Sequence, residues 1–500
     1  MRKSVKFSCR EGKKIFLKRN KKHVESRIAL YYNKPKLPKN DFDMREGFTL
    51  AKERLQTDMT MGSPVKIILN FTIPIFIGNM FQQFYSMADT IIVGKFVGTK
   101  ALAAVGSVGT IMFLILGFLQ GLTAGFSVLT AQRFGAGDMA GMRKTVGTAA
   151  VLSVGITIVM TVGSMLAMKP LLMFMHTPED IFQDAYTYIM IICAGIAASV
   201  LYNLLSGVLR ALGDSKTPLY FLILSAVLNI GLDLLLILVF HMGAAGAAYA
   251  TVVSQGVSGI GCLFYIAKKV PLLKLHREDF RIEVYMAKMQ LAIGLPMALQ
   301  YSITAIGTMM VQSALNMLGS MSVAAFTAAN KIEQIGTQAY VALGTTMATY
   351  CAQNMGAGQI KRIRKGFRAA TIIGSIYSVL LAIPMVTVGK YLVYFFVSGD
   401  VSAIMGQADI YLKCVGIFFI PLTIVNVYRN GIQGMGYGLL PMMAGVAELV
   451  GRGVVAMLAA WKHSYVGACL ASPFAWVLAG GLLLVMYFKI MKHQEKYFVS

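Results

Sequence analysis

Two acidic side chains interrupt hydrophobic stretches of this 500-residue chain, where an isolated charge is costly. Asp89 follows Tyr85 by four residues, and Asp233 follows Asn229 by the same spacing. Residues four apart share one face of a helix, so each acid has a second oxygen-bearing side chain beside it. Such oxygens suit a hard cation such as Na⁺, while two adjacent acids suit a shared proton. The pattern predicts a site for H⁺ or Na⁺ and leaves that choice open.

Further oxygen-bearing side chains lie in nearby hydrophobic stretches, at Thr251, Asn203 and Tyr188. The alternative is that Asp89 and Asp233 only make structural hydrogen bonds between helices. A carboxylate in the middle of a membrane costs about 2.5–3.5 kcal/mol on insertion scales, so such residues usually face a cavity or a partner. Two acids in one half of the chain therefore favour a functional site.

The second half of the chain has two further buried acids. Glu448 precedes Arg452 by four residues, which favours a structural ion pair along one helix. Glu333 lies two residues after Lys331, and two interpretations stay open for it: an ion pair with that lysine, or a place in a cavity that binds cations.

Composition predicts an all-α polytopic membrane protein. Hydrophobic residues make up 56% of the chain and charged residues 14%, against about 25% charged in soluble domains. The apolar runs are continuous and about 20 residues long, as transmembrane helices require, and they lack the alternation of a membrane barrel. We predict twelve spans, at 66–94, 101–132, 143–168, 182–210, 218–240, 244–268, 285–316, 322–354, 365–389, 405–429, 440–461 and 465–490.

The charge distribution predicts the orientation of these spans. The formal net charge is +24, but Lys and Arg gather before residue 64 and in every second connection, as at Arg143 and Lys144, and not on one face that could bind nucleic acid. Both termini are therefore expected in the cytoplasm, without a cleavable signal peptide. We expect residues 1–63 to form a basic, disordered extension and 491–500 a cytoplasmic tail.

An internal repeat organises the hydrophobic part of the chain. The stretch 131–137, Ala-Gln-Arg-Phe-Gly-Ala-Gly, recurs at 352–358 as Ala-Gln-Asn-Met-Gly-Ala-Gly. Six spans in each copy give both halves the same orientation, related by a pseudo-two-fold axis along the membrane normal. We therefore expect an N-terminal six-helix lobe (64–268), a basic cytoplasmic linker (269–284) and a C-terminal six-helix lobe (285–490) that rock against each other.

Several motifs resemble the multidrug and toxic compound extrusion (MATE) family. They are Pro74 followed by Tyr-Ser-Met-Ala-Asp-Thr-Ile-Ile-Val-Gly at 85–94, the repeated Ala-Gln motif, Leu-Arg-Ala-Leu-Gly-Asp at 209–214, and Leu-Asn-Ile-Gly-Leu-Asp at 228–233. The resemblance covers about residues 64–490. It implies export of cationic amphipathic drugs in exchange for Na⁺ or H⁺. Carried over by motif, it implies a cation site of Asp89, Asn229, Asp233 and Thr251 within a network of Tyr85, Tyr188 and Asn203.

The resemblance also implies a hinge and differs from one branch of the family. Pro74 interrupts the hydrogen-bond ladder of the first span and is expected to be the hinge, although a static kink is an equal alternative. Na⁺-driven members have an acid just after Gly-Leu-Pro in the seventh span, but here residues 297–302 contain none, which argues against a second cation site. A polyspecific cavity is expected to include Glu333, Met87, Met309, Gln300 and Tyr301.

No nucleotide-binding or catalytic motif appears, so we expect no enzyme, no catalytic residue, no cofactor and no metal beyond the coupling Na⁺. An ion gradient is then the remaining energy source. The other function considered is a lipid or oligosaccharide flippase, for which a strongly cationic cavity is typical. We expect a bacterial inner-membrane protein that is monomeric, contacts lipid and small cationic substrates, and binds no nucleic acid.

Overall fold

The computed structural model describes residues 58–175, 177–395 and 401–498, and every regular element in them is a helix. The predicted extension at 1–63 therefore lies almost wholly outside the described residues. The first half contains α3 (Pro64–Ile92), η1 (Val93–Val97), α4 (Thr99–Gly135), α5 (Met139–Phe174), α6 (Glu179–Ala194), α7 (Ile196–Ala211), α8 (Lys216–Leu234), η2 (Leu235–Val239) and α9 (Gly243–Lys269). We call these helices the N-half.

After two short 3₁₀ turns, η3 (Pro271–Leu273) and η4 (Arg277–Phe280), the second half repeats this order. It contains α10 (Val284–Asn316), α11 (Ser320–Gly356), α12 (Ile360–Thr387), η5 (Gly389–Phe395), α13 (Val401–Gly416), α14 (Phe419–Gly434), α15 (Leu439–Trp461) and α16 (Tyr465–Phe498). We call these the C-half. Both halves contain one bent pair at the same place in the order: α6 and α7 meet at 45°, and α13 and α14 at 50°.

The number of candidate spans differs from the predicted twelve. Among the described residues, nine helices are long and apolar enough to cross a membrane, or eleven if each bent pair is one span. The predicted eighth span, 322–354, corresponds to α11, which is 37 residues long but too polar to be among them. Four polar residues lie close together in its first half: Asn330, Lys331, Glu333 and Gln334. A helix of that length reaches about 55 Å, so length is not what excludes it.

The predicted cytoplasmic tail at 491–500 is helical where the structure describes it, because residues 491–498 continue α16. Gln494 is buried and donates to the Tyr437 hydroxyl at 2.8 Å, and Arg364 pairs with Glu495 at 2.7 Å. Contacts with α12 and with the turn before α15 thus extend the helix past the hydrophobic stretch.

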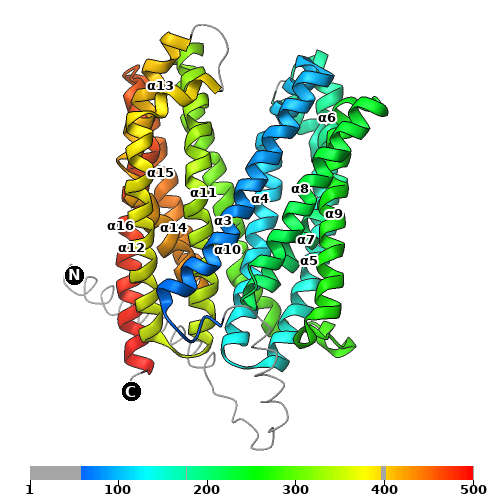
Figure 1. The fold of residues 1–500 in the computed structure, drawn as a ribbon, viewed down its shortest axis with the longest axis vertical. Coiled ribbons are helices and arrows are strands. Elements are labelled where there is room, and N and C mark those ends of the chain that lie inside the picture. Colours follow the sequence, from blue (N-terminus) through cyan, green and yellow to red (C-terminus); the bar gives the residue numbers. More distant parts are fainter. Residues whose placement is uncertain (1–57, 176, 396–400, 499–500) are drawn as a thin grey trace, which may run out of the picture. The chain divides into compact units, whose positions relative to one another are not determined.

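Helix α3 connects the two halves. Figure 1 shows it running obliquely from the helices of the C-half to those of the N-half. At its start, Ile68 and Phe71 are fully buried in the hydrophobic core of the C-half. Thr72 then donates to Thr346 of α11 at 2.8 Å, whereas Gly78 lies against Leu222 of α8. Pro74 therefore stands where α3 passes from one half to the other.

Helices α4 and α10 pack closely where glycines replace larger side chains. A Cβ added at Gly125 would lie 2.4 Å from the Cα of Gly294, and one added at Gly121 2.8 Å from the Cα of Ala298. Nothing lies within 4 Å of a Cβ added at Gly109, nearer the start of α4. The halves are thus in contact along the second part of α4 and not beside Gly109.

We expect Gly125→Ala to destabilise the protein by about 1–3 kcal/mol, because the new methyl group meets backbone that cannot rotate away. Thermal unfolding in detergent measures this as a lower midpoint. Gly109→Ala is the matched control on the same helix, and its midpoint should equal that of the unmodified protein or exceed it. Equal midpoints for both variants would contradict the close helix contact.

Candidate ion-coupling site

Asp89 and Asp233 lie together within the N-half. Helix α3 packs along α8, and this places the Asp89 and Asp233 side chains close enough to interact. Asp233 has no exposed surface, whereas Asp89 is half-buried. The two acids thus lie on neighbouring helices. This is the arrangement that a joint site of Asp89 and Asp233 requires.

Several buried oxygens at this point receive no hydrogen bond from the described residues. They are Oδ1 of Asp89, both carboxyl oxygens of Asp233, and Oδ1 of Asn229. Buried polar atoms without a partner are rare in proteins and costly to maintain. Oxygens of carboxylate and amide groups converging in this way fit a proton or a hard monovalent cation, which would satisfy them.

Other side chains of the predicted network surround the acids. Asn229 donates from Nδ2 to the Thr251 hydroxyl of α9 at 3.4 Å. Tyr188 of α6 is buried close to both acids, and Tyr85 lies one turn before Asp89. Asn203 of α7 is half-buried, and no described contact joins it to either acid.

Sequence reasoning missed one member of this network. Gln255 of α9 lies beside Tyr85 and accepts a hydrogen bond from Ser199 of α7. Its signal was available, because Gln255 follows Thr251 by four residues and so lies on the same helix face. Helices α3, α6, α8 and α9 thus contribute side chains around Asp89, and α7 joins them through Ser199.

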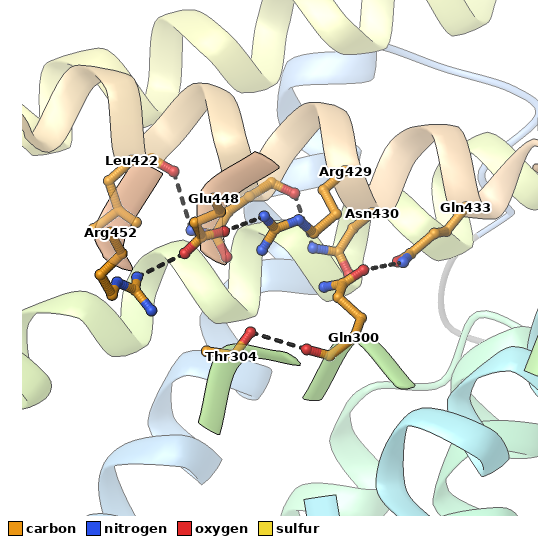
Figure 2. A network of polar contacts seen from close by, with 9 residues as sticks. Gln300, Thr304, Leu422, Arg429, Asn430, Gln433, Glu448 and Arg452 are labelled. Atoms are coloured by element: carbon orange, nitrogen blue, oxygen red, sulfur yellow. Dashed lines mark hydrogen bonds and ion pairs between the residues drawn. The ribbon is translucent and has the colours of Figure 1, made fainter. Parts of the chain in front are cut away.

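The C-half has a different polar cluster, shown in Figure 2. Glu448 of α15 accepts from Arg429 of α14 at 2.5 Å and from Arg452 at 2.7 Å, and all three side chains are buried. The predicted pair of Glu448 with Arg452 is confirmed. Arg429, near the end of α14, is the second partner of Glu448.

Glu333 belongs to a neighbouring group. The hydroxyl of Tyr411 donates to its carboxylate, and Asn330 donates to the same oxygen at 3.3 Å. Lys331 is exposed and makes no ion pair among the described contacts. The proposed pairing of Glu333 with Lys331 was wrong, because residues two apart on a helix point in different directions.

The sequence matches a protein-family model in two places. The model for MatE matches residues 74–235 and again residues 293–458. The chain belongs to the MATE family. Its members are transporters of the multidrug efflux type and not enzymes. The two matches also fall one in each half, which agrees with the repeat in the sequence.

Relatives and solved structures agree with membership of the MATE family. The probable multidrug resistance protein YpnP of Bacillus subtilis is 33% identical over 392 residues, covering 77% of this chain and 86% of the relative. An FAD transporter of Shewanella oneidensis is 26% identical over 432 residues, covering 84% and 94%. The fold matches the outward-facing conformation of a multidrug resistance MATE family transporter with a TM-score of 0.83 and 23% identity, over 87% of this chain and 98% of that structure. The protein is thus a multi-pass membrane protein with the MATE fold.

The residues predicted for a substrate cavity of this MATE protein lie on three helices. Met87 is half-buried on α3, and Glu333 is buried on α11. On α10, Tyr301 packs against Gly121 of α4, Gln300 accepts from Gln433 at 2.7 Å, and Met309 is exposed. No described contact joins these five residues into one pocket, so their joint role stays a prediction.

Proposed function

We propose that the protein is an antiporter that exports cationic amphipathic drugs in exchange for H⁺ or Na⁺. The observation that carries this proposal is the pair of Asp89 and Asp233, whose buried oxygens lack donors among the described residues. Two ionised carboxylates side by side in a low-dielectric site repel each other strongly. A proton or Na⁺ between them removes this repulsion, and Asn229 and Thr251 supply further oxygens.

The proposed mechanism is competition between the ion and the drug. With both acids ionised, negative charge attracts a lipophilic cation to the site from the cytoplasm. Binding of the coupling ion from outside neutralises the acids and favours release of the drug. Coupling requires that the two facing states differ in affinity for each of them. Because Asp233 is fully buried, we propose that the ion enters past the half-buried Asp89.

Helix α3 can transmit a change at this site to the C-half. Its second part holds Asp89 against α8, while its first turns lie in the core of the C-half. A change in charge at Asp89 therefore acts on a helix that contacts both halves. We propose Pro74 as the hinge between these parts, since a proline has no N–H for the carbonyl four residues earlier.

The proposal includes the arrangement in the membrane. Two six-helix lobes, 64–268 and 285–490, would rock against each other about the site, with the linker 269–284 and both termini in the cytoplasm. The excess of Lys and Arg in the connections on that side supports this orientation. A monomer in a bacterial inner membrane is the simplest state.

A second candidate is transport of an anionic, phosphate-bearing substrate, as a lipid or oligosaccharide flippase would require. One relative is an FAD transporter, and the C-half contains two buried guanidinium groups at Arg429 and Arg452. The acid Glu448 between them already offsets one of the two charges. The first candidate is therefore preferred.

Proteoliposomes distinguish these candidates. A gradient of Na⁺ and a gradient of pH are imposed separately, and movement of a cationic dye and of FAD is followed in each. We expect one ion gradient to drive the dye and neither to drive FAD. Dye movement that ignores both gradients would exclude ion-coupled export of cations, and driven movement of FAD alone would favour the second candidate.

A further inference from the structure

The repeated motif lies at the contact between the two halves. Gln132, at the end of α4, donates from Nε2 to the carbonyl of Gly434 in α14 at 2.9 Å. Gln353, at the matching place in α11, donates from Nε2 to the carbonyl of Ala211 in α7 at 2.8 Å. Each glutamine thus reaches from its own half into the other.

The two acceptors are also equivalent in the repeat. Ala211 precedes Gly213 by two residues, and Gly434 precedes Gly436 by two. Both of these glycines have positive φ, +89° and +95°, and both end a helix. In a contact between two equivalent surfaces, residue i touches residue j and j touches i. The pair of hydrogen bonds has this reciprocal form.

The backbones touch at the same place. A Cβ added at Gly135 would lie 2.0 Å from the carbonyl oxygen of Gln353, and one added at Gly356 would lie 1.8 Å from that of Gln132. Each copy of the motif therefore supplies a glutamine that binds across the contact and a glycine that receives the other copy. This explains why glutamine and glycine recur together at 132 and 135 and at 353 and 356.

A third element joins this contact through Gln353. The backbone N–H of Met59 donates to Oε1 of Gln353 at 3.2 Å, and Asn354 donates to the Met59 carbonyl at 2.9 Å. Arg362 also donates to the carbonyls of Met59, Met61 and Gly62. The segment that leads into α3 is thereby fixed to the same point, and α3 is the helix that contains Asp89.

Contacts between the halves are concentrated toward this end of α4. The glycines of α4 whose added Cβ would meet backbone of the C-half, Gly121, Gly125 and Gly135, all lie in its second part, whereas Gly106 and Gly109 in its first part have nothing within 4 Å. Separation of the halves at the motif end must break both glutamine bonds, since each spans the contact. The two motif copies, 131–137 and 352–358, are therefore placed to hold the protein closed on this side.

We infer that Gln132 and Gln353 form a reciprocal gate that keeps this end of the transporter closed and must open once in each transport cycle. The role of this gate in transport rests on the proposed function, in which the two lobes rock between two facing states. The gate determines the equilibrium between the closed and the open arrangement of the two halves. This equilibrium is measured without a drug or an ion gradient. Failure of the gate and failure of the proposed ion coupling are therefore distinguishable.

The test measures the distance between the halves at this end. Spin labels are placed at Ala140 and Lys361, which are exposed equivalents at the starts of α5 and α12, in a background without native cysteines that retains dye export. Double electron–electron resonance then measures the distance between the two labels and the populations of molecules with a short and with a long distance. We expect Gln132→Ala and Gln353→Ala each to raise the ratio of long to short separations about five-fold, and the double variant to raise it further.

Two more variants make the result specific. Gln132→Glu and Gln353→Glu keep the shape of the side chain but replace the donating N–H₂ with oxygen, so they should open the gate without leaving a cavity. Gln312→Ala, on α10, removes only a bond to Asn316 within the same helix and should leave the ratio unchanged. The gate proposal is overturned if the distance distribution is unchanged in the Gln132→Ala, Gln353→Ala double variant and in the Gln132→Glu, Gln353→Glu double variant. It is also overturned if Gln312→Ala gives an equal shift.

Discussion

Replacement of Asp233 by asparagine is expected to lower ion-driven dye transport at least a hundred-fold, while the protein is still inserted in the membrane. The amide removes a titratable group whose two oxygens are buried and receive no hydrogen bond from the described residues. It therefore removes the charge for which ion and drug compete, at little cost in shape. Asp89→Asn should have a similar effect, because Asp89 faces the same group of buried oxygens from α3, which packs along α8.

The measurement is dye flux in proteoliposomes at equal amounts of reconstituted protein, with the ion gradient that drives the unmodified transporter. Asp184→Asn is the control: it removes an exposed acid from α6 of the same half and should leave the flux within about two-fold. Unfolding midpoints show whether each variant is folded. Wild-type flux in both Asp233→Asn and Asp89→Asn would place the coupling site elsewhere.

Replacement of Glu448 by glutamine is expected to destabilise the protein by about 3–5 kcal/mol. The change leaves two buried guanidinium groups, Arg429 and Arg452, without the carboxylate that both of them bind. Uncompensated buried charge costs far more than the loss of one hydrogen bond. We expect a markedly lower unfolding midpoint in detergent and less protein in the membrane fraction.

Two comparisons separate this effect from a general loss of charge. Asp409→Asn breaks the pair with Lys413, whose side chain is 49% exposed, and should cost at most about 1 kcal/mol. Replacement of all three buried residues together, as Arg429→Met, Glu448→Leu and Arg452→Met, should restore most of the stability, because no charge is then left unpaired. If Glu448→Gln unfolds like Asp409→Asn, the cluster contributes little to stability.

Much of the candidate site in the N-half could be predicted from residue types. An acid inside a hydrophobic stretch is expensive enough to indicate a role, and the four-residue spacing of Tyr85 and Asn229 placed an oxygen beside each acid. The meeting of Asp89 with Asp233 depends on how α3 packs along α8. Periodicity within each helix says which residues share a face, but it does not say which helix that face meets.

The same limit explains the features that sequence reasoning missed. Ile68 and Phe71 are buried in the core of the C-half, yet their apolar character does not distinguish them from Leu69 of the same helix, which is exposed. Gln132 and Gln353 were visible as a repeat, but their acceptors are backbone carbonyls of Ala211 and Gly434. A carbonyl is present at every residue, so an acceptor of this kind leaves no signature in the residue type.

The polarity of α11 has a consequence for biogenesis. A segment that contains Asn330, Lys331, Glu333 and Gln334 partitions poorly into lipid when it leaves the translocon alone. Its buried carboxylate is satisfied by Tyr411 of α13, which is synthesised about 80 residues later. The earlier helices α3 and α4 already contact α11, but the burial of Glu333 with a hydrogen-bond donor has to wait for α13, which does not yet exist when α11 emerges.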